Sequence, residues 1–178
     1  MKDYPLGRIG GFRVSADPSA LAGALGLWAV LAAGVRAMGV PWGRAVRVGL
    51  VTSGLHWASE LWHQGGHALA ARSAGYPMTG LRFWTILSAS VYPADEPVLP
   101  ARIHIRRALG GPLASALLTV ALGLMWRATP RTQHRRHALA RFAFWENLIV
   151  FTLGALVPLG FNDGSSLRHW WPKRSAEC

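Results

Sequence analysis

The chain has 178 residues, of which 51% are hydrophobic and only 15% carry a formal charge, and its net charge is +11. A soluble domain of this size usually carries more charged residues. Its Lys and Arg residues are scattered among polar stretches without interleaved aromatic residues, so we expect them to face anionic lipid and no nucleic acid. The single Cys178 excludes an internal disulfide.

Long apolar runs predict an integral membrane protein. Three stretches contain no Asp, Glu, Lys or Arg, and a fourth is interrupted only by a stripe of polar residues: 18–35, 108–126, 147–162 and 48–71. Each is close to the roughly 17–25 residues that a helix needs to cross the hydrocarbon core of a bilayer. We therefore expect a single all-α domain over 1–178, built as a four-helix transmembrane bundle. The predicted helices lie at about 18–38, 46–73, 105–126 and 140–158.

The N-terminal segment predicts the orientation of this bundle. No short apolar core with a small-residue cleavage site precedes the first span, so we expect that span to be retained. With four spans both termini lie on one side, and 11 of the 19 Lys and Arg residues belong to that side. The positive-inside rule then places both termini in the cytoplasm of a bacterial-type membrane. Residues 6–14 are Gly-rich and partly alternating, which indicates an edge strand at the interface.

The second predicted helix carries the polar stripe. His63 and His67 are four residues apart, so they lie one above the other on the same helix face. Neutral imidazoles at this spacing can give one zinc ion two nitrogen ligands at about 2 Å. His56 and Glu60 extend the stripe toward the start of the helix. Titratable groups inside an apolar helix are costly in lipid and indicate a functional site, although two histidines at this spacing can also simply pack.

The segment 78–100 changes character after this helix. It is rich in β-branched and aromatic residues and then in proline, which predicts one or two short strands and an extended loop. We expect a small β insert at the interface, between the second and third helices. A free strand edge there could pair with an unwound substrate segment, and we expect Leu87, Ser88 and Ala89 to contact it. The alternative is a connecting loop anchored by Trp84.

A carboxylate, Asp163, follows the fourth predicted span in a broken, Gly-flanked segment. The second and fourth helices of an up-down bundle run parallel, so Asp163 and the two histidines reach a similar depth. Two His and one carboxylate leave a fourth tetrahedral position open, which is typical of a catalytic zinc. Such a metal would polarise a scissile carbonyl and lower the pKa of its bound water.

Several motifs follow one another in a set order. They are the N-terminal strand, His63-Gln-Gly-Gly-His67, the strand-rich insert, Gly111-Pro112, and Pro158…Asp163-Gly164. Together they resemble the site-2 proteases, a family of intramembrane zinc metalloproteases. The resemblance implies that His63, His67 and Asp163 bind zinc. It also implies that the substrate is a transmembrane segment of another protein.

The chain departs from the family pattern at the catalytic base. The family has His-Glu-x-x-His, in which the glutamate is the general base, whereas Gln64 stands here. An amide cannot accept a proton near neutral pH, so help worth about 10²–10⁴-fold in rate is missing. Ser115 and Ala155 stand where the family has asparagines that help to hold the substrate, and Asn162 replaces a leucine.

Several explanations stay open at this level. The chain could be a pseudoprotease that binds membrane-protein partners without cleaving them, or an inactivated form, which the other losses argue against. Glu60 could act as the base in place of Gln64. It lies four residues earlier on the same helix face, about 6 Å away along the axis, and a water molecule could relay the proton over this distance. Glu60 could instead orient His63 or His56.

Two further classes compete with a zinc protein that acts on transmembrane segments. A haem-binding redox protein could use His56, His63, His67 or His104, but axial pairs usually come from facing helices and no c-type attachment motif is present. A plain membrane scaffold would use the histidines for packing alone.

Overall fold

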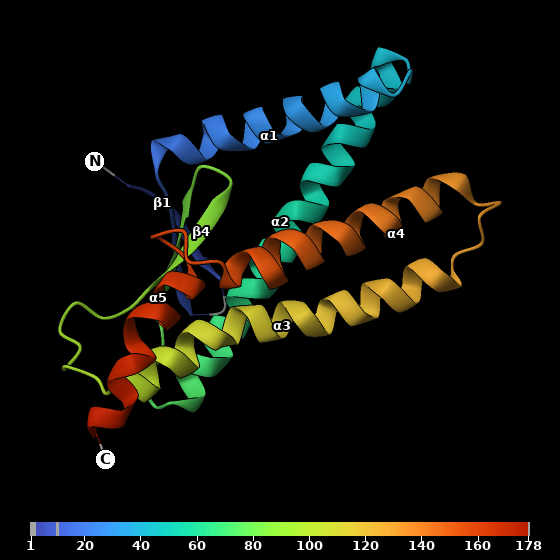
Figure 1. The fold of residues 1–178 in the computed structure, drawn as a ribbon. Coiled ribbons are helices and arrows are strands. Elements are labelled where there is room, and N and C mark those ends of the chain that lie inside the picture. Colours follow the sequence, from blue (N-terminus) through green and yellow to red (C-terminus); the bar gives the residue numbers. More distant parts are fainter. Residues whose placement is uncertain (1–2, 10, 178) are drawn as a thin grey trace.

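Helices make up most of the computed structural model, which describes residues 3–9 and 11–177 (Figure 1). The α-helices are α1 Pro18–Ala37, α2 Trp42–Ser73, α3 Ala101–Ala128, α4 His134–Glu146 and α5 Asp163–Trp170. A π-helical segment, η1 Asn147–Gly154, continues α4, and a short 3-10 helix, η2 Pro172–Glu177, follows α5. Among the described helices, α1 and α3 are long and apolar enough to cross a membrane. The four-span bundle stays a prediction.

The fourth helical segment differs from the predicted 140–158 at both ends. It begins at His134, within a basic stretch that the sequence indicated as loop. The start is held by His137, whose Nε2 accepts a hydrogen bond from the Trp126 indole and whose Nδ1 lies 3.0 Å from the Thr129 carbonyl oxygen. The helical turns end before Pro158, because a proline cannot donate the next backbone hydrogen bond.

The sheet is wider than the predicted insert. Strands β3 Gly80–Trp84 and β4 Leu87–Val91 form the expected hairpin, but β1 Tyr4–Ile9 and β2 Phe12–Ala16 join it in the order β1-β2-β3-β4. The N-terminal segment is thus a hairpin and not one edge strand. The β2–β3 pair is parallel and the other two pairs are antiparallel. This order leaves β4 at the edge of the sheet that lies beside α2 (Figure 1).

Helices α2 and α3 touch through their backbones. A Cβ built on Gly66 would overlap the carbonyl oxygen of Gly110, and a Cβ on Gly110 would overlap the carbonyl oxygen of Gly66. Small residues allow such close crossings between helices. One residue on, a Cβ on Gly111 would overlap the Nε2 atoms of His63 and His67, so the absence of a side chain there leaves room beside the imidazoles.

Gly66→Ala is expected to destabilise the protein, because the new methyl group has no room at this crossing. Overpacking typically costs about 1–3 kcal/mol. Gly65→Ala is the matched control, since a Cβ at Gly65 would meet nothing within 4 Å. In that variant, better helix propensity should leave stability unchanged or raise it by up to about 1 kcal/mol. Thermal unfolding in detergent, followed by circular dichroism, compares the two; equal melting temperatures would contradict the close crossing.

Candidate metal centre

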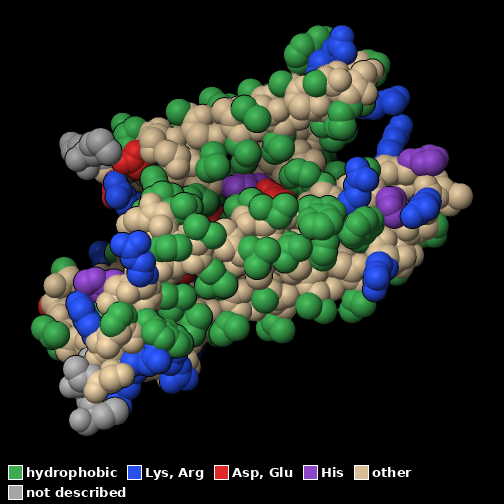
Figure 2. Space-filling view, viewed as in Figure 1, with side chains coloured by type: hydrophobic (Ala, Val, Ile, Leu, Met, Phe, Trp, Pro, Cys, Tyr) green, Lys and Arg blue, Asp and Glu red, His purple; other side chains and the backbone are tan. Residues whose placement is uncertain are grey.

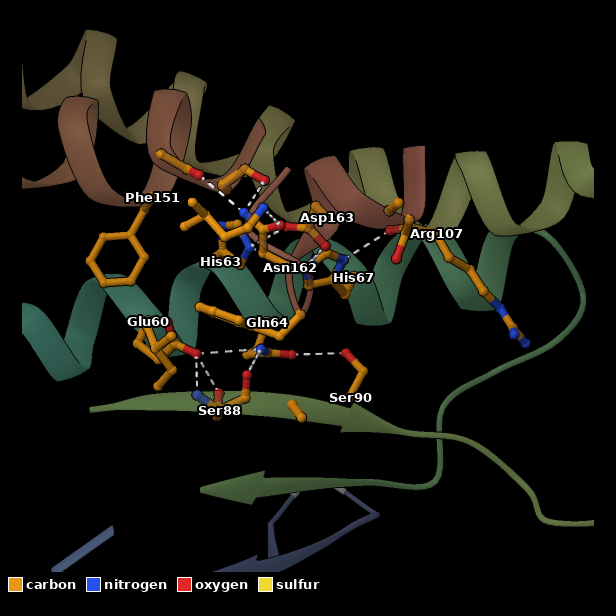
Figure 3. Close-up of a pocket in the computed structure, with 18 of the residues that line it drawn as sticks. Glu60, His63, Gln64, His67, Ser88, Ser90, Arg107, Phe151, Asn162 and Asp163 are labelled. Atoms are coloured by element: carbon orange, nitrogen blue, oxygen red, sulfur yellow. Dashed lines mark hydrogen bonds and ion pairs between the residues drawn. The ribbon is translucent and has the colours of Figure 1, made fainter. Parts of the chain in front are cut away.

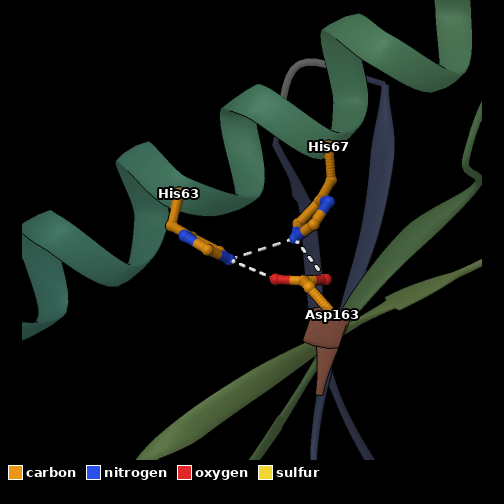
Figure 4. Close-up of side chains that lie close together, drawn as sticks. All are labelled: His63, His67 and Asp163. Atoms are coloured by element: carbon orange, nitrogen blue, oxygen red, sulfur yellow. Dashed lines mark hydrogen bonds and ion pairs between the residues drawn. The ribbon is translucent and has the colours of Figure 1, made fainter. Parts of the chain in front are cut away.

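Three side chains from two distant parts of the chain converge on one point (Figure 4). His63 and His67 lie one turn apart on α2, and Asp163 is the first residue of α5. The His63 Nε2 atom lies 3.1 Å from Asp163 Oδ2, and the His67 Nε2 atom lies 3.3 Å from Asp163 Oδ1. The two Nε2 atoms are 3.1 Å apart. Candidate ligand atoms of all three residues lie within 4.8 Å of one another, so the group could hold a metal ion.

The hydrogen bonds behind the imidazoles decide what they present to this point. Nδ1 of His67 lies 2.8 Å from the Arg107 carbonyl oxygen, which can only accept, so Nδ1 carries the proton and Nε2 the lone pair. The Gly111 amide also approaches Nδ1, at 3.3 Å, but the shorter contact with the carbonyl determines the tautomer. Nδ1 of His63 lies 3.0 Å from the Ser115 hydroxyl and can donate to it in the same way.

With both imidazoles in these tautomers, the converging atoms present lone pairs toward one point. Two imidazole nitrogens and a carboxylate repel one another at these distances unless a positive charge lies among them. Two nitrogens and one oxygen suit zinc, and three protein ligands leave a fourth position open. The residues present thus fit the metal that the sequence predicts.

Asn162 fixes the position of the carboxylate, a role the sequence analysis missed. It caps α5: its Oδ1 accepts hydrogen bonds from the Ser165 amide at 3.3 Å and the Leu159 amide at 3.1 Å. Its amide group donates to the carbonyls of Gly154 and Ala155, at 3.2 Å each. The chain is thereby held on both sides of Asp163. An Asn just before a helix is a known capping signal, and it could have located this role.

Ser115 lies behind a ligand. Its side chain is fully buried against Nδ1 of His63, and it is not among the residues that line the cavity beside the centre. The resemblance to the site-2 proteases implies that Ser115 contacts substrate. Its position instead suits the outer partner of a metal-binding histidine, which fixes the orientation of the ring.

A cavity of about 540 Å³ opens beside the three converging side chains (Figure 3). The two histidines and Asp163 line the cavity on one side. Strand β4 also lines it, and the lining includes Leu87, Ser88 and Ala89, the other residues predicted to bind substrate. Aromatic side chains from Trp84 and Phe161 cover another part of its wall, where their rings pack edge to face. The cavity thus combines a polar floor with apolar walls, as ligand sites usually do. Contact of β4 with a substrate stays a prediction.

Glu60 and Gln64 line the same cavity, but both are bonded to β4 (Figure 3). Glu60 Oε1 accepts hydrogen bonds from the Ser88 amide at 2.8 Å and the Ser88 hydroxyl at 2.5 Å. The polar partners of His56 are Glu146 and the Ile86 carbonyl, while those of His63 are Ser115, Asp163 and His67. Glu60 therefore orients β4, and the expectation that it orients His56 or His63 is wrong.

Arg107 joins the centre to the loop after β4. Its carbonyl holds His67, and its buried guanidinium binds both carboxylate oxygens of Glu96, at 2.9 Å and 2.5 Å. These hydrogen bonds keep the pKa of Glu96 below its ordinary value. The guanidinium carbon also lies 3.9 Å from the centre of the Tyr92 ring. No spacing rule in the sequence points to this pair, because Glu96 lies in an irregular loop.

The fold and these ligands define a mostly helical protein with a small mixed sheet and a possible buried metal centre. Neither a protein-family model nor a curated protein matches the chain. Among solved structures, the site-2 protease from Methanocaldococcus jannaschii matches with a TM-score of 0.61 and 16% sequence identity. The match covers 97% of this chain and 73% of that one. The chain therefore has a site-2-protease-like fold.

Proposed function

We propose that this protein is a zinc-binding, site-2-protease-like membrane protein that acts on transmembrane segments of other proteins. The observation that carries the proposal is the meeting of His63, His67 and Asp163, with Asp163 a hundred residues along the chain from His63, in an arrangement that leaves a ligand position open. The fold it shares with a site-2 protease supports the same class.

The exposed faces of the helices support a place in the membrane. Large apolar side chains point outward along α1 and α3: Leu21, Leu25, Val30, Leu113, Leu117, Val120 and Leu124. Figure 2 shows apolar side chains along the helices, with Lys and Arg gathered toward their ends. Apolar surface of this extent indicates contact with lipid or another apolar partner. We propose a bacterial-type cytoplasmic membrane, with both termini in the cytoplasm.

Different residues would have different roles at the metal centre. His63, His67 and Asp163 would hold zinc, and a zinc ion there would supply a Lewis acid for a peptide carbonyl. Ser115 and the Arg107 carbonyl keep the two imidazoles in the orientation that presents Nε2. The cavity beside β4 would take an unwound segment of the substrate.

Both candidates for the general base are engaged with other groups. Gln64 is an amide, and Glu60 already accepts bonds from Ser88 and lies against the Gln64 amide nitrogen, 3.4 Å away. These contacts favour a second form of the function, in which the protein binds a segment without cleaving it.

Metal analysis of the purified full chain tests the proposal. We expect about one zinc ion per chain after exposure to zinc and removal of the excess, and a colourless sample. A folded chain that takes up no zinc would contradict the proposal. A Soret band would instead support the haem class, which depends on the same histidines.

A further inference from the structure

The outer edge of β4 is covered by one face of α2. His56, Glu60 and Gln64 follow one another at intervals of four residues on that helix. Ile86, at the turn before β4, and Ser88 and Ser90 within it alternate along the opposing strand. Four residues of helix rise about 6 Å, and two residues of strand rise about 6.6 Å, so the two series stay in step.

Each position in the helix series has a polar partner in the strand series. His56 Nε2 lies 2.7 Å from the Ile86 carbonyl oxygen. Glu60 accepts from the Ser88 amide at 2.8 Å. Gln64 uses both ends of its amide: Nε2 donates to the Ser88 carbonyl at 3.0 Å, and Oε1 accepts from the Ser90 hydroxyl at 2.9 Å. We call these six residues the polar ladder.

The ladder is braced from behind. His56 is buried, and its Nδ1 lies 2.8 Å from Oε1 of Glu146, at the end of α4. The turn of the β3–β4 hairpin is held from the other side, where the Thr85 amide donates to the Ser19 hydroxyl of α1 at 3.1 Å. The hairpin is therefore hydrogen-bonded to both α1 and α2, and α2 is in turn joined to α4.

In an antiparallel pair, the backbone groups of alternate residues face away from the partner strand. At Ser88 both outward groups are taken, the amide by Glu60 and the carbonyl by Gln64. Those are the groups that an added strand would use.

We propose that the polar ladder holds the outer edge of β4 closed and that Gln64 is its positioning residue. The inference rests on the proposed function in one respect. If β4 binds a substrate strand, that strand can pair with β4 only after the polar ladder has opened. Gln64 suits this place because it must donate to one acceptor and accept from one donor. A carboxylate at the same place would turn an oxygen toward the Ser88 carbonyl and toward the Glu60 carboxylate, which lies 3.4 Å from the Gln64 amide nitrogen.

Hydrogen–deuterium exchange of the full chain in detergent at neutral pH tests the ladder. In Gln64→Glu we expect the backbone amides of residues 86–91 to exchange at least about tenfold faster, since the side chain can no longer donate to the Ser88 carbonyl or to Glu60 and a like charge is added beside Glu60. Ser90→Ala, which removes the hydroxyl that donates to Gln64 and adds no charge, should accelerate the same amides less. Amides in the middle of α3 should keep their rates in both variants.

Gln133→Glu is the matched control, because it makes the same chemical change at an exposed glutamine before α4. The proposal is overturned if residues 86–91 exchange equally fast in Gln64→Glu, Ser90→Ala and Gln133→Glu. Zinc content measured on the same samples separates the two proposals. Faster exchange in a chain that binds no zinc would support the ladder and contradict the proposed function, while unchanged exchange in a zinc-loaded chain would do the reverse.

Discussion

Asp163→Ala is expected to weaken zinc binding by more than about 100-fold, beyond the 10–100-fold that the loss of an outer partner typically costs. The carboxylate is the one charged ligand of the centre, and it lies 3.1 Å and 3.3 Å from the two imidazole nitrogens. Without it, a dication would be held by two neutral nitrogens in a largely buried site. Competition with a chromophoric chelator, followed by metal analysis, measures the change in affinity.

Two variants bracket this result. Asp95→Ala removes an exposed carboxylate from the loop after β4 and should leave zinc affinity unchanged. Ser115→Ala removes the partner of Nδ1 in His63 and should cost about 10–100-fold. If Asp163→Ala binds zinc as tightly as Asp95→Ala does, the carboxylate is no ligand and the proposed three-residue centre is wrong.

Gln64→Glu is expected to produce cleavage of a membrane-tethered reporter that the natural chain cuts slowly or not at all. The substitution supplies a carboxylate one residue after a proposed ligand, and general-base help is worth about 10²–10⁴-fold. The new side chain can no longer donate to the Ser88 carbonyl, which weakens its attachment to β4. Product formation in proteoliposomes measures the gain.

Glu60→Gln and a double variant complete the comparison. Gln64→Glu combined with Asp163→Ala should be inactive, because the centre then lacks a ligand. Glu60→Gln in the otherwise unaltered chain should leave cleavage of the reporter unchanged, since the remaining side-chain oxygen can still accept a hydrogen bond from the Ser88 amide. A natural chain that cleaves, with Glu60→Gln inactive, would show that Glu60 is the base and that the non-cleaving form of the function is wrong.

The candidate metal centre could be predicted from sequence because it depends on simple rules. The four-residue spacing puts His63 and His67 on one helix face, and the parallel course of the second and fourth helices brings Asp163 to their depth. Those rules hold even though the fourth helix begins earlier and turns π-helical at Asn147.

The surroundings of the centre could not be predicted in this way. The pairing of β2 with β3 joins residues more than sixty positions apart, and no local pattern specifies a parallel register. The bonds of Glu60 and Gln64 depend on that placement of β4. The helical spacing therefore predicted the correct face for Glu60, but its hydrogen-bond partner is Ser88 and not His56 or His63.

The backbone crossing at Gly66 and Gly110 positions the two histidines of the centre relative to α3. Each carbonyl occupies the space that a Cβ on the opposite glycine would need, so α2, which carries both imidazoles, packs directly against the backbone of α3. Asp163 reaches them from a separate segment, after Pro158 and after Gly160, whose φ of 96° gives the chain a sharp bend. The assembly of the centre therefore depends on the hydrogen bonds by which Asn162 ties this segment to the end of the preceding helix.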